Sequence, residues 1–331
     1  MKLSEIGEFG LIARWQKKLA LRSGVALGIG DDGAVLDALN APIVTCDALV
    51  ENVHFRRDWS APFQIGRKAI AVNVSDIAAM GGTPVAAFIA LSAPPNTSTQ
   101  FLDELYDGLE NAAAEYELTI AGGDLTSISS ELTIAITIIG NAPRPVLRSG
   151  AQVGDVLIVS GTLGDAAAGL ELLKNPQIEV SSAAREFLLR RHLDPVARLD
   201  AMNAVLAAVG ENLRAALDLS DGLSGDAAHI ANRSGVSLEI ETAKLPISPQ
   251  CHEAAAKLGC DALNWALGGG EDYELLLCVR EDCAAEVMAA MENRSTAASV
   301  IGRVVARAEG DVILINESGR RNDAPPAFRH F

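Results

Sequence analysis

LTIAITII at residues 132–139 is the strongest strand pattern in this sequence, because Leu or Ile alternates with Thr or Ala along most of it. Shorter strand patterns lie at 43–46, 85–91 and 118–121. Helical patterns occupy 66–80, which run into a Gly-Gly pair, and 98–116, which carry one apolar stripe. Another helix is expected near the start, where Ile12, Trp15 and Leu19 would share a face. The first half is therefore predicted to be a mixed α/β domain.

The periodicity breaks at residues 141–154, NAPRPVLRSGAQVG, which contain two prolines and two glycines. We therefore expect two domains, 1–150 and 151–331. The second half again alternates strands with helices, which predicts a second α/β domain. Its expected strands are 155–161, 215–219, 236–241 and 273–279, and its expected helices are 164–173, 183–191, 196–208 and 223–233.

The composition is that of a globular protein with room for two cores, since its 331 residues are 49% hydrophobic and 21% charged. Asp and Glu number 43 against 27 Lys and Arg, which gives a net charge of −16. This charge has the wrong sign for a protein that binds the phosphate backbone of nucleic acid. Nucleic acid is therefore not expected as a partner, and an acidic surface that promotes solubility accounts for most of the excess.

The five cysteines form no Cys-x-x-Cys pair and accompany no metal-binding histidine spacing. Neither a structural zinc site nor a disulfide framework is indicated, and this cysteine usage fits the reducing cytoplasm. The N-terminal residues contain no continuous apolar segment, and no later run approaches the roughly 18 apolar residues of a membrane helix. We expect a cytoplasmic protein without a signal peptide or membrane span.

Acidic residues beside glycines or other small residues recur along the chain. The stretches are GIGDDGA around Asp31 and Asp32, TCDALVENVHF around Asp47, SDIAAMGG around Asp76, GGDLT around Asp124, DLSDGLSGD around Asp218 and Asp221, and GGGEDYE at 268–274. Glycine lets the backbone approach a ligand closely, and carboxylate oxygens are ligands that Mg²⁺ prefers. Asp47 and Asp124 are expected to follow strands directly, at the carboxyl ends where α/β folds gather ligands. The pattern predicts metal-assisted phosphate chemistry.

Each stretch also has an ordinary interpretation. The Asp-Gly pair in GIGDDGA would make a hairpin turn between two apolar runs, and Ser220 or Asp221 would cap the helix that follows. Asp76 would be an exposed helical acid, although it shares a face with Asn73 and Met80 on an apolar helix and so needs a partner. Several unrelated turns nevertheless explain the recurrence less well than one Mg²⁺ site does.

No GxxxxGK[ST] occurs, so a P-loop is not predicted. Metal ions must then carry much of the phosphate charge, with help from cations such as Arg148. His54 lies seven residues after Asp47, close enough along the chain to face the same pocket. A structural role in hydrogen bonding is the alternative for this histidine.

Taken together, these stretches resemble the bacterial thiamine-monophosphate kinase family. GIGDD, CDALVENVHF, AVNVSDIAAMGG, GGDLT, RSGAQVGD, DLSDGL, GGGEDYELL and a C-terminal HF match in order and spacing along nearly the whole chain. Looser forms occur in the wider superfamily of aminoimidazole ribonucleotide synthetase, selenophosphate synthetase and a hydrogenase maturation protein. The VHF segment and GGGEDYELL point to the kinase in particular.

The resemblance implies that ATP phosphorylates thiamine monophosphate to thiamine diphosphate at a site with several Mg²⁺ ions. It implies an N-terminal α/β domain that binds metal and ATP and closes a β-barrel with its twin in a homodimer. The C-terminal α/β domain would cover the nucleotide and complete the site. The implied metal ligands are Asp32, Thr45, Cys46, Asp47, Asp76, Asp124, Asp218 and Asp221, of which Asp47, Asp76, Asp124 and Asp221 would be catalytic. The implied ATP contacts are Gly123, Asp124, Arg148 and Ser220, and the implied thiamine-phosphate contacts are His54 and Glu271.

This chemistry suits the residues. A phosphate monoester is mostly dianionic near pH 7, so the acceptor oxygen needs no general base, and the enzyme has mainly to align two anions that repel each other. Mg²⁺ held by acids does this without a Ser/His/Asp set. Two positions depart from the family, because Cys46 stands where Thr is frequent and Pro325 stands near the place of a Trp that stacks on thiamine. Phe328 is the expected replacement for that stacking face.

Two other functions stay open from the sequence. One is an ATP-dependent synthetase of the same superfamily that phosphorylates an amide or a selenide. The lack of a catalytic N-terminal Cys or Sec loop argues against the selenide only. The other is a non-catalytic sensor of nucleotide or thiamine phosphate. A sensor would need fewer metal-binding acids than a kinase does, whereas this chain has every acid that the resemblance implies.

Overall fold

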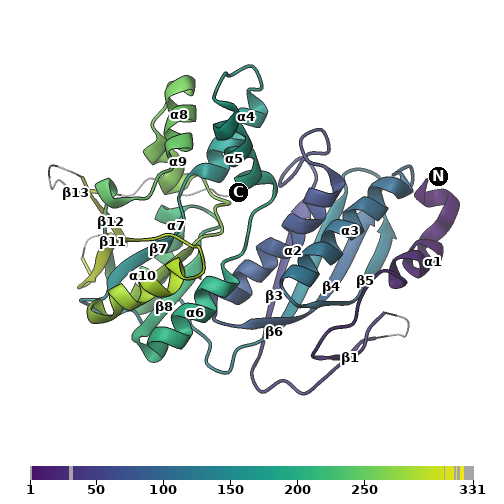
Figure 1. Cartoon of the computed structure of the whole chain (residues 1–331), viewed down its shortest axis with the longest axis horizontal. Coiled ribbons are helices and arrows are strands. Elements are labelled where there is room, and N and C mark those ends of the chain that lie inside the picture. Colours follow the sequence, from purple (N-terminus) through teal and green to yellow (C-terminus); the bar gives the residue numbers. More distant parts are fainter. Residues whose placement is uncertain (1, 30–32, 309, 317, 319–320, 324–331) are drawn as a thin grey trace. The chain divides into compact units, whose positions relative to one another are not determined.

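The structure, a computed structural model, describes residues 2–29, 33–308, 310–316, 318 and 321–323, without the side chains at 8–9 and 321–323. The chain forms two compact units. The N-terminal unit comprises Met1–Ile77 and Gly82–Arg144, and the C-terminal unit comprises Ala78–Gly81 and Pro145–Phe331. Each unit combines a sheet with helices (Figure 1), so the predicted two-domain mixed α/β architecture is confirmed. The roles assigned to residues 1–150 and 151–331 stay predictions.

The N-terminal unit is built on a four-stranded sheet in the order β3-β6-β4-β5. Its strands are β3 (Pro42–Val50), β4 (Thr83–Ala93), β5 (Thr119–Ser127) and β6 (Thr133–Asn141). Strands β4 and β5 run parallel, and the other neighbours are antiparallel. Helices α2 (Pro62–Ala79) and α3 (Thr99–Glu115) lie across one face of this sheet (Figure 1), while α1 (Leu3–Gln16) lies near β5 and β1 (Val25–Leu27) pairs with β2 (Val35–Leu36).

Alternation along β6 determines which face of the sheet is the core. Ile134, Ile136 and Ile138 are fully buried, whereas the residues between them are only half-buried. The helices cover the buried face, and they approach each other so closely that a Cβ on Gly66 would lie 2.1 Å from the carbonyl oxygen of Leu105. The unit is therefore a sheet with helices on one face only.

Two strand predictions were too short. Strand β3 runs through Asp47, and β5 runs through Asp124, so these acids lie inside strands and not after them. Both strands are edges of the sheet, where one side of the backbone has no neighbouring strand and Asp or Gly costs less. Helix α1 also ends at Gln16, so Leu19 does not belong to its face.

The C-terminal unit has a seven-stranded sheet in the order β13-β12-β9-β11-β7-β10-β8. Its strands are β7 (Val156–Ser160), β8 (Leu213–Asp218), β9 (Ser237–Glu241), β10 (Leu275–Val279), β11 (Ala298–Val305), β12 (Val312–Ile315) and β13 (Arg321–Asp323). Its helices are α4 (Asp165–Lys174), α5 (Ser182–Leu193), α6 (Leu199–Val209), α7 (Leu223–Ser234), α8 (Pro249–Leu258), α9 (Ala262–Gly268) and α10 (Ala284–Glu292). Helices α8 to α10 and strands β11 to β13 have no counterpart among the predicted elements.

Strand β10 lies in the interior of this unit, since all five of its residues are buried. Leu276 and Cys278 belong to one apolar core with α7, and Leu275 and Leu277 belong to another with α6 and α10. Helices therefore cover both faces of this sheet, unlike the sheet of the N-terminal unit. Within the described residues, none of the helices is both long and apolar enough to cross a bilayer.

Candidate functional site

Strand β3 and helix α2 bring together one group of predicted site residues in the N-terminal unit. The hydroxyl of Thr45 donates a hydrogen bond to Oδ2 of Asp76, and Oδ1 of Asn73 accepts the backbone N–H of Asp47 at 3.0 Å. Asn73 is itself fully buried and donates to the carbonyl of Ala69 at 3.0 Å. Asp76 thus has the partner that a carboxylate on an apolar helix was predicted to need.

Cys46 lies between Thr45 and Asp47 in β3, so its side chain points to the opposite face of the sheet. Its thiol is exposed there. The face that carries Thr45, Asp47 and Asp76 therefore offers oxygen atoms, which suit a hard cation such as Mg²⁺ better than a soft one. Cys46 can contribute to that face only through its backbone.

Asp124 lies on the other face of the same sheet. The strand register joins Asp47, Ile136, Ile89 and Gly123 in one row across the sheet, and Asp124 is one residue further along β5. Its side chain is exposed on the face that the helices leave open. The sheet therefore separates Asp124 from the group formed by β3 and α2.

A cavity of about 950 Å³ lies beside β5 in the N-terminal unit. Gly122, Gly123 and Asp124 line one side of it, and Gly28 and Gly33 from the segment between β1 and β2 line another. A side chain at Gly123 would not fit, because its Cβ would lie 2.0 Å from the carbonyl oxygen of Ile89. The backbone of the GGD motif thus forms part of a cavity wall.

Two aromatic residues that the sequence did not place in a site also line this cavity. The rings of Trp15 and Tyr106 stack with their centroids 3.5 Å apart and their planes 11° apart. Trp15 donates its indole N–H to Asp103 at 3.1 Å, and Tyr106 lies on α3. Both residues belong to apolar helix faces, so their sequence pattern indicates only core packing.

His54 lies in the turn that follows β3. Its Nδ1 accepts the backbone N–H of Val50 at 3.0 Å, which is the structural hydrogen bond weighed as the alternative role. Because Nδ1 is an acceptor here, the proton of the neutral ring is on Nε2. The carbonyl of His54 also accepts from Lys68 at 3.4 Å. The turn is therefore fixed from both sides, and the predicted substrate contact stays a prediction.

The GIGDDGA segment joins two strands that pair antiparallel, with Val25 opposite Leu36. This pairing agrees with the hairpin interpretation of the segment. Asp32, a predicted metal ligand, and Phe328, the predicted stacking residue, lie outside the described residues, so their predicted roles remain untested.

In the C-terminal unit, two motifs far apart in the sequence lie side by side. Segment 219–220, just after β8, pairs with the GGGEDYE segment just before β10. The N–H of Glu271 donates to the carbonyl of Ser220 at 2.7 Å, and the N–H of Tyr273 donates to the carbonyl of Leu219 at 2.8 Å. Asp218, at the end of β8, is buried opposite Leu275. The structure thus brings together the predicted ligands Asp218, Ser220 and Glu271.

Glu271 and Tyr273 both have positive φ angles, 59° and 51°, which are costly for residues other than glycine. Oε2 of Glu271 lies 3.1 Å from Nδ1 of His192 on α5, a residue that the sequence did not single out. The segment that presents Glu271 is therefore held in a strained conformation by its neighbours.

Buried ion pairs and hydrogen bonds surround the acidic residues that follow Glu271 in this segment. Glu274 is fully buried and accepts hydrogen bonds from Arg191 at 2.8 Å, Arg198 at 2.7 Å and Ser160 at 2.5 Å. Burial opposes ionisation, yet Arg198 and Arg191 hold the pKa of Glu274 below its ordinary value. Asp272 accepts the N–H of Gly164 at 2.8 Å at the start of α4. Burial raises the pKa of Asp272 to about 7, although Arg191 opposes this.

Asp226, in the first turn of α7, is a further buried acid of the DLSDGLSGD stretch. Its Oδ2 accepts the backbone N–H groups of Asp221 at 3.0 Å and Gly222 at 3.1 Å. Burial raises the pKa of Asp226 to about 7, whereas the N–H of Asp221 and the guanidinium of Arg148 lower it. Arg148, a predicted ATP contact, is thus near enough to this loop to act on it electrostatically.

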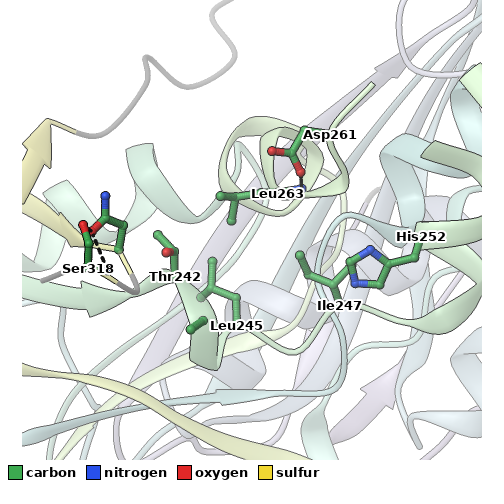
Figure 2. Close-up of a pocket in the computed structure, with 9 residues that line it drawn as sticks. Thr242, Leu245, Ile247, His252, Asp261, Leu263 and Ser318 are labelled. Carbon is green, nitrogen blue, oxygen red and sulfur yellow. Dashed lines mark hydrogen bonds between the residues drawn. The ribbon is translucent and has the colours of Figure 1, made fainter. Parts of the chain in front are cut away.

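A second cavity, of about 560 Å³, lies beyond the carboxyl ends of β9 and β12 in the C-terminal unit (Figure 2). Two of its polar side chains make local hydrogen bonds. Asp261 caps α9 by accepting the N–H of Leu263 at 2.9 Å, and Ser318 donates to Asn316 at 2.7 Å. No predicted site residue is among the described residues that line it.

Within the described part of the chain, no three His, Cys, Asp or Glu side chains form a group that could hold a metal ion. Mg²⁺ usually binds through one or two carboxylates, several waters and the phosphates of a substrate, so it does not need a preformed cage. Oxygen donors such as Thr45, Asp47 and Asp76 therefore fit Mg²⁺ as an ion that arrives together with a nucleotide.

Comparisons with known proteins agree across the chain. Residues 30–142 match the family model for the AIR synthase related protein N-terminal domain, and residues 152–315 match that for the C-terminal domain. The chain is 40% identical to the thiamine-monophosphate kinase of Aquifex aeolicus over 277 residues, which are 83% of this chain and 87% of that protein. The thiamine-monophosphate kinase structure from Stenotrophomonas maltophilia K279a matches with a TM-score of 0.83 at 34% identity, covering 96% of this chain and 98% of that one. The structure of AaThiL complexed with AMPPCP and TMP has a TM-score of 0.78 at 37% identity and covers 100% of this chain and 99% of that one.

Proposed function

The chain belongs to the thiamine-monophosphate kinase family, and on that premise we propose that it transfers the γ-phosphoryl group of ATP directly to thiamine monophosphate. The products are ADP and thiamine diphosphate. The observation that carries this proposal is the 40% identity with a thiamine-monophosphate kinase over 83% of the chain. Support comes from the match to a solved structure that holds AMPPCP, an ATP analogue, together with TMP.

We assign metal binding to oxygen-bearing groups in each unit, most of them carboxylates. They are Asp32, Thr45, Asp47, Asp76 and Asp124 with the backbone of Cys46, and Asp218 and Asp221. These residues would hold Mg²⁺, which would supply positive charge to offset the negative charge of the transferred phosphoryl group. The acids supply fixed negative charge that holds the cation in place. Thr45 keeps the Asp76 carboxylate oriented through its hydroxyl hydrogen bond.

The cavity beside β5 is our candidate for part of the nucleotide site. Trp15 and Tyr106, whose rings stack on each other, form an apolar part of its wall, and Gly122 and Gly123 form a part without side chains that a ligand could approach closely. Asp124 at its rim places a carboxylate where metal-bound phosphates would need one. Arg148 and Ser220 are assigned as further ATP contacts in the C-terminal unit.

Three residues are assigned to the acceptor. The Glu271 carboxylate suits the cationic ring of thiamine, and the strained segment around it resists displacement. His54 can donate from Nε2 while Nδ1 accepts from Val50. Phe328 is assigned to the stacking face.

We also propose that the chain is a homodimer. The open face of the N-terminal sheet carries Val44, which is 63% exposed, beside the half-buried alternate residues of β6. A second copy that packs on this face would bury it and close the predicted β-barrel over the side of the sheet where Asp124 lies.

The test is incubation of the purified chain with Mg-ATP and thiamine monophosphate, followed by chromatography for thiamine diphosphate. Thiamine and a reaction without acceptor are the controls. The proposal requires product from the monophosphate alone. ATP binding without product would favour the synthetase or sensor alternatives.

A further inference from the structure

The end of β8 and the loop that joins it to α7 carry three residues assigned above to metal or ATP: Asp218 on the strand, and Ser220 and Asp221 in the loop. A loop that binds a nucleotide must hold its backbone still, since a displacement of about 1 Å in such a site is costly. The residues that fix this loop are therefore functional even if they never touch a ligand.

Asp226 contacts the loop from the side of the helix. It lies in the first turn of α7, and the N-cap residue just before that helix, Gly222, has no side chain that could cap it. One oxygen of Asp226, Oδ2, accepts from both Asp221 N and Gly222 N, at 3.0 and 3.1 Å. Two consecutive backbone groups of the loop are thus bound to a single atom.

The glycine segment before β10 restrains the loop from the other side. A Cβ on Gly222 would lie 2.8 Å from the Cα of Gly268, and a Cβ on Gly270 would lie 2.8 Å from the carbonyl oxygen of Ser220. The N–H of Glu271 donates to that same carbonyl at 2.7 Å. The loop backbone is therefore packed against one segment and hydrogen-bonded to Asp226.

We infer that Asp226 is a positioning residue, which sets the backbone of the loop and so orients Asp218, Ser220 and Asp221 toward metal and ATP. The inference rests on the proposed function, because that function supplies the metal and ATP that these residues would bind. The contacts that hold the loop do not depend on it. Asp226 itself is only 4% exposed, and its Oδ2 is already bound by two N–H groups. It acts through the backbone and not as a ligand.

Two substitutions at this position separate geometry from charge. Asp226→Asn keeps an oxygen that can accept both N–H groups but removes the negative charge. Asp226→Ala removes the acceptor and leaves two N–H groups without it, one of them buried. Asp282→Ala removes an exposed acid elsewhere in the unit and serves as the matched control.

The first measurement is hydrogen–deuterium exchange of peptides that span 217–223, on the full-length protein without ligand. We expect Asp226→Ala to speed exchange at 221–222 by about tenfold or more, because these N–H groups lose the acceptor that protects them. Asp226→Asn and Asp282→Ala should exchange like the original chain. If residues 221–222 exchange as slowly in Asp226→Ala as in the original chain, the inference is overturned.

The second measurement is steady-state kinetics with Mg-ATP and thiamine monophosphate. We expect Asp226→Ala to raise KM for ATP by about tenfold or more, and Asp226→Asn to stay within about twofold of the original chain. Equal damage in both variants would mean that the charge itself acts, which also overturns the inference. If the original chain makes no thiamine diphosphate, the proposed function fails, and the exchange experiment alone decides the role of Asp226.

Discussion

At the scale of single residues, Asp124 is the acid whose role is most open to test. We expect Asp124→Asn to lower kcat by about 100- to 1,000-fold, because the negative charge that would hold Mg²⁺ beside the transferred phosphoryl group is lost. The fold should be unchanged, since the side chain is exposed. Steady-state kinetics and thermal melting check both points. Glu131→Gln, which alters an exposed acid of the same unit, is the control, and near-normal kcat in Asp124→Asn would remove this residue from the catalytic set.

Asp272 leads to a prediction about pH. Its pKa is raised to about 7 by burial, with Arg191 opposing, so the folded protein binds a proton that the unfolded chain releases near pH 3.8. Folding is therefore favoured most at low pH, and this contribution is lost as pH rises through about 7. Asp272→Asn does not titrate. The free energy of unfolding of this variant, relative to that of the original chain, should therefore increase from pH 5 to pH 8, because the contribution of Asp272 changes between roughly pH 4 and pH 7. Urea unfolding of both proteins measures this difference, and a difference independent of pH would contradict the assignment.

The sequence identified the types of residue in the site better than their positions. Every acid singled out stands beside small residues, and that pattern can be read directly. The sequence could not show that Asp47 and Asp124 lie inside strands, because Asp and Gly are rare in strands. A strand accepts these residues more readily at the edge of a sheet, and only the strand order shows which strands are edges. Tyr106 and His192 were missed since both belong to helix faces that also serve packing.

At the scale of elements, the contact between α2 and α3 depends on two glycines. A Cβ on Gly66 would lie 2.1 Å from Leu105 O, and one on Gly108 would lie 2.0 Å from Phe63 O. Since backbone atoms cannot move aside as a flexible side chain can, Gly66→Ala should cost about 2–3 kcal/mol of unfolding free energy. Denaturant unfolding measures this. Gly33→Ala, where no atom lies within 4 Å, is the control, and equal stability of the two variants would refute the close contact.

Element prediction succeeded where one periodicity extended over many residues. The alternation at 132–139 became β6, and the stripe at 98–116 became α3 (Thr99–Glu115). Helix α9 has only seven residues, which are too few turns for a periodic signal, whereas α8 has ten residues, as many as the predicted α4, and was missed all the same. The expected β-barrel depends on a second chain and cannot be read from the strands of one.

At the scale of the whole molecule, the account predicts a dimer. Sedimentation equilibrium should give twice the 34.6 kDa of the chain. Val44→Asp should shift the mass toward the monomer, because the dimer would bury an unpaired charge on the open sheet face. Val153→Asp alters a valine of equal exposure, 63%, in the C-terminal unit and should leave the dimer intact. A monomeric original chain would contradict the proposal.

The central claim is direct transfer of a phosphoryl group from ATP to thiamine monophosphate. It is tested most directly by supplying ATP labelled in the γ-phosphate, with Mg²⁺ and thiamine monophosphate, and locating the label by chromatography. The account predicts label in the terminal phosphate of thiamine diphosphate, one for each ADP formed, and none when Mg²⁺ is chelated. Label found only in inorganic phosphate, with no thiamine diphosphate, would contradict it.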